Sequence, residues 1–327
     1  MAKLTLVQAL NLAFRQEMER DPSVIILGED VGKDGGVFRV TEGLYEKFGD
    51  QRVIDTPLAE SGIVGTSIGL SLNGMKPVAE IQFDGFCYVA FHQIESHAAR
   101  FRQRSHGRYH CPMVIRMPYG AGIHALEHHS ESREAYFAHT PGLKMVIPSS
   151  PRKARGLLTS AIRDPDPVIF FEPKALYRSV REEVDESVEE SYPLGKAEVT
   201  KEGKDITLIA YGAMMRPTMQ AAEELESNDK VSAEVIDLLT ISPMDSDTIV
   251  ESVKKTGRAV VIHEAPRNCG VGAEVIARIV EKAFLYLEAP VRRLTGYDVH
   301  TPYFAREKYY LPDKERIVHI AKETLSF

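Results

Sequence analysis

The sequence contains only three cysteines, Cys87, Cys111 and Cys269, among 327 residues, and it contains no tryptophan. The cysteines lie far apart and are odd in number, so they fit neither a disulfide framework nor the paired spacing of a zinc site. Such sparse use of cysteine is typical of proteins from reducing compartments, and we expect a cytoplasmic location. The missing tryptophan carries no functional message by itself.

Long apolar runs and an excess of positive charge are also missing. No run approaches the roughly 18 apolar residues that a membrane span needs, and residues 1–5 lack the pattern of a secretory signal. The 40 Lys and Arg are outnumbered by 47 Asp and Glu, which gives a net charge of −7. We therefore expect neither a membrane nor a nucleic acid as a partner.

The common glycine motifs for binding phosphates are absent as well. The glycine-rich stretch 28–36 follows an apolar run, but it matches neither the dinucleotide pattern G-x-G-x-x-G nor a P-loop. We interpret it as a flexible loop at the carboxyl end of a strand. Loops in that position can still line a ligand site.

Short apolar runs alternate with helical patterns along the whole chain. The runs predict strands at 24–28, 52–55, 77–81, 113–116, 144–147, 167–171, 205–210, 233–237, 258–262 and 290–294. Helices are predicted at 60–72, 87–104, 152–163, 216–226, 245–255, 271–285 and 314–324. Continuous apolar strands between helices are typical of mostly parallel sheets covered on both faces, so we predict an α/β fold.

The length of the chain suggests two domains. A polar, acidic stretch between residues 180 and 192 interrupts the alternation, which then begins again. We expect a first domain at 1–180, a linker at 181–195 and a second domain at 196–327.

The most informative motif is Asp55-Thr56-Pro57-Leu58-Ala59-Glu60-Ser61-Gly62. Pro57 and the Ser61-Gly62 pair indicate a turn from a strand into a helix, with Glu60 near the helix start among apolar residues. A carboxyl group in such surroundings can hold a proton and donate it to a ring nitrogen of a cofactor. The simpler interpretation is an exposed acid that interacts with the helix dipole.

Two further motifs follow predicted strands. In Glu80-Ile81-Gln82-Phe83-Asp84-Gly85-Phe86, strand alternation can turn Gln82 and the aromatic residues toward a cleft, although such aromatics are more often part of a core. The glycine-rich segment 119–132 carries His124, His128 and His129 together with Glu127 and Glu131. We favour proton transfer over metal binding there, while surface histidines remain the simplest interpretation.

Six motifs in order resemble one family: GEDVG…GGVF, DTPLAESG, EIQFDGF, GAGIHALEHHSES, FFEPKALYR and AYGAM. The chain is similar over nearly its whole length to the beta subunit of the thiamine-diphosphate-dependent 2-oxo acid dehydrogenases. That subunit belongs to the decarboxylating component of the pyruvate and branched-chain complexes. The resemblance implies a pyrimidine-binding domain, then a transketolase C-terminal-like domain, in an α2β2 heterotetramer.

The resemblance also assigns roles to individual residues. Glu60 matches the glutamate that hydrogen-bonds the aminopyrimidine of thiamine diphosphate, Phe86 the aromatic that packs on this ring, and Gln82 a polar neighbour. His129 matches a histidine near the thiazolium and the incoming lipoyl group, where it would stabilise or protonate intermediates of acyl transfer. His124 and His128 are weaker candidates for this role.

One expected motif is missing. Thiamine enzymes carry a G-D-G motif, followed by an asparagine, that holds magnesium and the diphosphate, and this chain has none. We therefore expect the chain to supply half of an active site, with the diphosphate half and the magnesium held mainly by an alpha subunit. It would then be an acyl-transferring, lipoamide-dependent 2-oxo acid dehydrogenase that is active only with its alpha subunit.

The family also implies a structural potassium ion in this subunit. The matching positions are Met113, Ala161 and Ile162, through backbone carbonyls, with Asp164 and Asp166 nearby. Oxygen ligands of these kinds suit a hard cation. The alternative interpretation of 164–167 is a plain Asp-Pro turn.

In the second domain the resemblance implies interfaces rather than chemistry. The subunit-binding domain of the lipoyl acyltransferase would dock there, with Asp298 and the terminal carboxylate of Phe327 facing basic partner residues. Simple solvation of both groups is the alternative.

The substrate is the least determined feature. The segments HHSES, EAYFAHTPG and FFEPKALYR favour a branched-chain 2-oxo acid of the 3-methyl-2-oxobutanoate type, with pyruvate dehydrogenase and acetoin dehydrogenase beta subunits as alternatives. A catalytically silent interaction subunit is the alternative from another class. A single-chain synthase is disfavoured because the diphosphate motif is absent.

Overall fold

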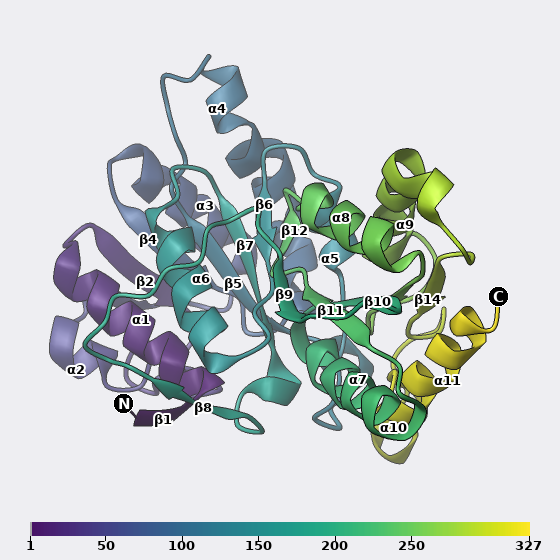
Figure 1. Ribbon diagram of the computed structural model, residues 1–327. Helices are drawn as coiled ribbons and strands as arrows, with labels where there is room; N and C mark the ends of the chain where they lie inside the picture. Colours follow the sequence, from purple (N-terminus) through teal and green to yellow (C-terminus); the bar gives the residue numbers. More distant parts are fainter. Residues whose placement is uncertain (1) are drawn as a thin grey trace. The chain divides into compact units, whose positions relative to one another are not determined.

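The computed structural model describes residues 2–327, and the chain divides into two units (Figure 1). Unit 1 contains the residues up to Tyr119 together with Tyr136–Leu194. Unit 2 contains Gly120–Ala135 and Gly195–Phe327. The predicted α/β class with mostly parallel sheets is confirmed in both units.

Six strands of unit 1 follow the order β6-β7-β5-β4-β2-β3, and each neighbouring pair is parallel. They are β2 (Val24–Gly28), β3 (Val53–Asp55), β4 (Lys76–Glu80), β5 (Val114–Tyr119), β6 (Lys144–Val146) and β7 (Val168–Pro173). Because the strands are parallel, their carboxyl ends meet at one edge of the sheet. The residues that follow β2, β3 and β4 therefore lie next to one another.

Three helices of three or more turns accompany this sheet: α1 (Leu6–Arg20), α3 (Glu60–Leu72) and α6 (Pro151–Arg163). The hydroxyl of Ser150 caps the N-terminus of α6, and Pro151 occupies its first turn, as the sequence pattern favours. Short helices α2 (Leu44–Phe48) and α4 (Phe101–Arg104) lie in the connections, and α5 (Glu134–Ala138) spans residues of both units.

Unit 2 has its own sheet, with the strand order β14-β13-β10-β11-β9. All neighbouring pairs are parallel except β11 with β9, which is antiparallel. The strands are β9 (Glu198–Lys201), β10 (Ile206–Ala210), β11 (Ala233–Asp237), β13 (Ala259–Ile262) and β14 (Arg292–Leu294), with β12 (Thr240–Ser242) outside this sheet. The helices are α7 (Met215–Asp229), α8 (Ser246–Thr256), α9 (Val271–Ala283), α10 (Glu307–Tyr310) and α11 (Lys314–Leu325).

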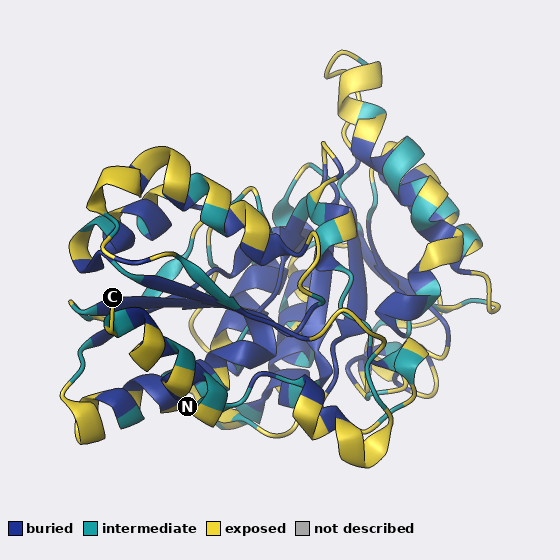
Figure 2. Ribbon diagram, turned by 90° about the vertical axis from the view of Figure 1, so that its right-hand side faces the viewer, coloured by how far each residue is buried: buried dark blue, intermediate teal, exposed yellow. Residues whose placement is uncertain are grey.

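Central strands of both sheets are buried along their whole length. Every residue of β2, β5, β7, β10, β11 and β13 is buried (Figure 2). Helix α6 is also buried along most of its length, and its more exposed positions are Arg152, Ser160 and Arg163. The core of each unit is therefore the apolar layer between its sheet and its helices.

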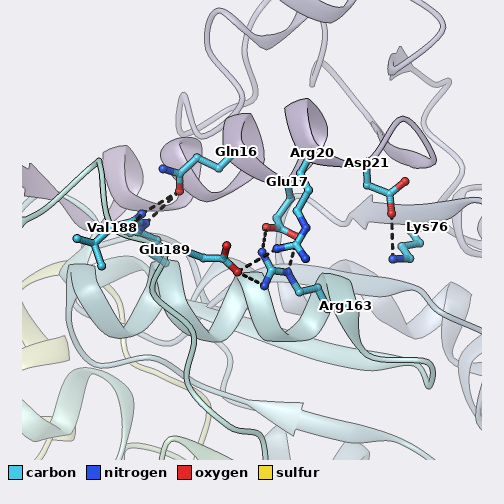
Figure 3. Close-up of polar contacts among 9 residues, drawn as sticks. Gln16, Glu17, Arg20, Asp21, Lys76, Arg163, Val188 and Glu189 are labelled. Carbon is cyan, nitrogen blue, oxygen red and sulfur yellow. Dashed lines mark hydrogen bonds and ion pairs between the residues drawn. The ribbon is translucent and has the colours of Figure 1, made fainter.

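The stretch 181–195, which the sequence predicts as a linker, contains a strand and several ion pairs. Residues Arg181–Val184 form β8, which pairs antiparallel with β1 (Ala2–Thr5). The Arg155 guanidinium donates to the Asp185 carbonyl at 2.8 Å. Glu189 accepts from both Arg20 and Arg163 (Figure 3). These contacts hold the stretch against α1 and α6.

The segment predicted as one helix over 87–104 is helical but irregular. It is a 3₁₀ turn at Asp84–Ala90, a π-helical turn at Gln93–His97, another 3₁₀ turn at Ala98–Arg100 and then α4. Such irregular helical turns often occur at functional sites. The first of them carries Phe86.

Candidate active site

Glu60 is the first residue of α3, which begins directly after the turn predicted from Pro57. Only 8% of Glu60 is exposed, so the exposed-acid interpretation is wrong. No side chain caps this helix start, and an acid in the first turn is stabilised there by the positive end of the helix dipole. The sequence thus places a buried carboxyl group at the sheet edge where β2, β3 and β4 end.

A second carboxyl group, Glu29, lies close to Glu60. Glu29 follows β2 directly and is also only 8% exposed. Its burial, followed by the negative charges of Glu60 and Asp30, raises the pKa of Glu29. Two neighbouring buried carboxyl groups favour a state in which one of them carries a proton, and a protonated carboxyl can donate a hydrogen bond.

Gln82 belongs to the same group of side chains. Its Nε2 atom donates to Asp30 Oδ2 at 3.2 Å, so the amide is fixed by the residue that follows Glu29. Asp30 has a left-handed backbone conformation (φ 57°), which is unusual for a residue other than glycine. Backbone strain of this kind tends to be retained at functional sites.

Aromatic rings adjoin these polar groups. The Phe86 ring meets the Phe83 ring edge-to-face, with centroids 5.5 Å apart, and Phe83 meets Phe38 at the same distance. Phe86 is half-buried, whereas Phe83 is buried. Unit 1 therefore presents a partly exposed aromatic face next to Gln82.

Asp55 supports the loop that carries Glu29 and Asp30. Its carboxylate accepts from the backbone N–H of Gly32 at 2.6 Å, and the Thr56 N–H donates to the Gly28 carbonyl at 2.9 Å. Both contacts join the end of β3 to the loop after β2. The first residue of the Asp-Thr-Pro motif thus has a structural role in unit 1.

Below this edge lies a fully buried charged network. Arg116, on β5, makes a bidentate contact with Glu172 (2.5 and 2.6 Å) and also contacts Glu80. The Tyr177 hydroxyl donates to Glu172 at 2.6 Å. The network joins β4, β5 and β7 and so fixes the strand ends that position Gln82.

His129 lies in unit 2, in the 3₁₀ turn Glu127–His129, whereas Glu60, Gln82 and Phe86 lie in unit 1. It is half-buried. His124 and His128 are exposed, and each faces an acid: His124 Nδ1 is 2.9 Å from Glu307, and His128 Nδ1 is 3.7 Å from Glu131. No group of three or more His, Cys, Asp or Glu within residues 2–327 is arranged to hold a metal ion.

Known proteins resemble this chain over its whole length. It is 53% identical over 327 residues to the pyruvate dehydrogenase E1 component subunit beta of Staphylococcus epidermidis, with 100% of each chain covered. The subunit of the same name from Acholeplasma laidlawii is 50% identical over 317 residues, covering 97% of this chain and 96% of the relative. This chain belongs to the beta-subunit family of the thiamine-diphosphate-dependent 2-oxo acid dehydrogenases.

The domain families of this beta-subunit chain agree with the fold. Residues 2–180 match the family "Transketolase, pyrimidine binding domain", and residues 195–317 match "Transketolase, C-terminal domain". A solved structure described as a split gene transketolase, inactive beta4 tetramer, has a TM-score of 0.82 at 22% identity and covers 99% of both chains. At 22% identity, this structural similarity is evidence for the fold alone.

Two of the five potassium positions implied by the beta-subunit family, Asp164 and Asp166, form ion pairs with cationic side chains. Lys144 Nζ lies 2.6 and 2.7 Å from the two Asp164 oxygens, and Arg102 Nε donates to Asp166 at 2.6 Å. The Met113 carbonyl accepts from Val168, and the Ala161 carbonyl accepts from Asp164. Because both carboxylates are neutralised by cationic side chains, a potassium ion here would depend on backbone carbonyls such as those of Met113, Ala161 and Ile162.

Asp298 and Phe327, the positions predicted to contact the acyltransferase, differ in their surroundings. Asp298 is exposed, and one of its oxygens accepts from the backbone N–H of Asn268 at 2.8 Å. Phe327 is 65% exposed, with the Arg292 guanidinium 5.4 Å from its ring. Within residues 2–327, no helix combines the length and apolarity needed to cross a bilayer.

Sequence reasoning missed Glu29 as a member of the site. Its position after an apolar strand in Gly28-Glu29-Asp30 was visible, but its proximity to Glu60 depends on the parallel pairing of β2 with β3 and β4. It also missed the buried acids of unit 2, Glu264 and Glu307, which bind the histidine loop.

Proposed function

We propose that this chain combines with an alpha subunit to form the decarboxylating component of a 2-oxo acid dehydrogenase. In this role it catalyses oxidative decarboxylation of the oxo acid and reductive acylation of the lipoyl group of an acyltransferase. The observation that carries the proposal is the buried Glu60 at the start of α3, beside the buried Glu29, in a chain 53% identical to such beta subunits.

Glu60 would act on the aminopyrimidine of thiamine diphosphate. The cofactor supplies the electron sink for loss of CO₂. The Glu60 carboxyl would hold a proton at a ring nitrogen, Gln82 would fix the polar edge of the ring, and Phe86 would pack on its face. Burial and the charge of Glu60 raise the pKa of the neighbouring Glu29 carboxyl, which favours the protonated form of Glu29.

His129 would act in the second half of the reaction, the transfer of the acyl group to the lipoyl sulfur. An imidazole can deliver or accept a proton near neutral pH. The diphosphate and its magnesium would be held mainly by the alpha subunit, because this sequence lacks the G-D-G motif. A potassium ion bound by backbone carbonyls, and docking of the acyltransferase at Asp298 and Phe327, remain parts of the proposal.

We propose pyruvate as the substrate, because the relatives at 50–53% identity are named for pyruvate. The branched-chain preference predicted from three short segments has no support from these names. We retain the cytoplasm as the proposed location, since the three cysteines are all free and one of them, Cys269, is exposed.

A reconstituted complex tests the proposal. The chain and its alpha subunit are purified together, and NADH formation by the complete complex is compared for pyruvate and 3-methyl-2-oxobutanoate. A higher kcat/KM for pyruvate supports the proposal, and a higher value for the branched acid restores the alternative. No turnover of either acid by an intact assembly would favour a silent interaction subunit.

A further inference from the structure

Two buried carboxylates of unit 2 bind the backbone of the loop that carries His129. Glu307, the first residue of α10, is 2% exposed, and Glu264, after β13, is 3% exposed. Buried carboxylates are stable only when hydrogen-bond donors satisfy their oxygens. Here the donors are backbone N–H groups of residues 120–135.

Glu307 binds the loop with both oxygens. The Gly122 N–H donates to Oε1 at 2.6 Å, and the His124 N–H donates to Oε2 at 3.0 Å. The His124 ring reinforces this contact, because its Nδ1 lies 2.9 Å from Glu307 Oε2 and 3.1 Å from the Phe304 carbonyl. His124 has a left-handed backbone (φ 58°), and this strained conformation turns its N–H group to the carboxylate.

Glu264 binds the beginning of the same loop. The Ala121 N–H donates to its Oε2 atom at 2.8 Å. A Cβ atom at Gly120 would lie 2.8 Å from Glu264 Oε1, so only glycine lets the backbone approach this closely. Hydrogen bonds of this charge-assisted kind are roughly twice as strong as neutral ones.

The far end of the loop is fixed in unit 2 as well. The Thr301 hydroxyl donates to the Ser130 carbonyl at 3.0 Å, and the Tyr211 hydroxyl donates to Glu134 at 2.7 Å. His129 therefore lies between two fixed points of one loop. Although residues 120–135 continue directly from β5 of unit 1, their backbone is anchored to unit 2.

We propose that Glu264 and Glu307 are positioning residues, which we call the carboxylate clasp: they fix residues 120–135 on the second domain and thereby set the position of His129. This inference rests on the proposed function where it concerns acyl transfer, and on the contacts alone where it concerns the order of the loop. The two parts are tested by different measurements.

Hydrogen exchange on the assembled complex tests the clasp itself. Glutamine offers one acceptor oxygen and one NH₂ donor, so in Glu307→Gln one of the two backbone N–H groups faces another donor. Amides of residues 120–135 should exchange faster in Glu307→Gln and Glu264→Gln, and should not change in Glu281→Gln, an exposed control on α9. Unchanged exchange in both clasp variants would overturn the proposal.

Separation of the two half-reactions tests the effect on His129. Decarboxylation is followed with ferricyanide as the electron acceptor, and acyl transfer with the lipoyl domain. In Glu307→Gln, acyl transfer should fall about 10- to 100-fold while decarboxylation is nearly retained, since small misplacements cost about that much. Glu307→Asp, which keeps the charge, should recover part of the loss. Equal falls in both half-reactions would contradict a positioning role.

Two further variants test the order of the loop and the role of His129 separately. Thr301→Val removes the hydroxyl that donates to the Ser130 carbonyl and that also contacts Tyr310. It should loosen the loop mildly, and it replaces Glu307→Gln if that variant does not assemble. His129→Ala should show the same separation of half-reactions as Glu307→Gln. If His129→Ala leaves acyl transfer intact, the proposed role of His129 fails, while the exchange experiment still decides on the clasp.

Discussion

Asp55 and Gly32 are in direct contact: the Asp55 carboxylate accepts the Gly32 backbone N–H at 2.6 Å, and a Cβ atom at Gly32 would lie 2.6 Å from Asp55 Oδ2. A side chain at position 32 would therefore displace the Asp55 carboxylate and break this hydrogen bond. The contact holds the loop that brings Glu29 and Asp30 to the candidate site.

We therefore expect Gly32→Ala to destabilise the chain by about 0.5–1.5 kcal/mol, the usual net contribution of one hydrogen bond. The matched control is Gly69→Ala in the middle of α3, where nothing lies within 4 Å of an added Cβ. That change should stabilise the chain by about 0.5–1 kcal/mol. Urea unfolding of the separately purified chain measures the change in stability for both variants. Equal changes in Gly32→Ala and Gly69→Ala would contradict a stabilising contact between Gly32 and Asp55.

Glu60→Gln should lower the turnover of the assembled enzyme by about 100-fold or more, because an amide cannot exchange a proton with a ring nitrogen. The assembly with the alpha subunit should remain intact on gel filtration, since the helix start itself is kept. Glu46→Gln, an exposed change on α2, serves as the control and should leave turnover unchanged. Retained turnover in Glu60→Gln would remove Glu60 from the chemistry.

Glu29→Gln should stabilise the chain at neutral pH and have no effect in acid. Burial and the charges of Glu60 and Asp30 raise the pKa of Glu29 above its usual 4.5, so the folded state binds this proton more tightly than the unfolded state. The stabilisation from proton binding is complete below pH 4.5 and is lost as the pH rises through the folded-state pKa. A neutral glutamine avoids that loss.

Thermal unfolding of the two proteins across this pH range measures the effect. The advantage of the glutamine should shrink when Glu60 is also changed to Gln, because one of the charges that raise the pKa is then gone. If the difference in stability between Glu29→Gln and the original chain is the same at all pH values, the raised pKa of Glu29 is contradicted.

Arg116→Leu should cost about 3–5 kcal/mol, because it leaves Glu80 and Glu172 buried without their cation. A double variant in which Glu172 is also leucine should recover part of that loss, since one uncompensated acid is removed. Lys282→Met, which breaks an exposed ion pair with Asp247 at 3.8 Å, should cost less than about 1 kcal/mol. Chemical denaturation measures all three, and similar costs for Arg116→Leu and Lys282→Met would be inconsistent with a buried network.

Much of the fold follows from local patterns. Helix α3 spans Glu60–Leu72, the predicted range after the turn at Pro57, and the continuous apolar runs form buried parallel strands. Helix α1 was missed although its signals are present, since Thr5 and Gln8 form a capping box in front of an amphipathic pattern.

Features that depend on tertiary pairing could not be predicted. The contacts of the acidic stretch 181–190 could not be predicted, because Arg155 and Arg163 lie near it only in the folded chain. For the same reason the sequence did not reveal that Glu29 lies near Glu60, or that Glu264 and Glu307 bind the histidine loop. Each of these contacts joins residues far apart in the chain.

The central claim is that this chain supplies the pyrimidine half of a shared cofactor site, and calorimetric titration of thiamine diphosphate with magnesium tests it most directly. We expect no measurable binding to the chain alone and clear binding once an alpha subunit is present. Glu60→Gln should weaken binding to the pair without preventing its assembly. Tight binding to the isolated chain would contradict the claim, because the chain would then hold the diphosphate by itself.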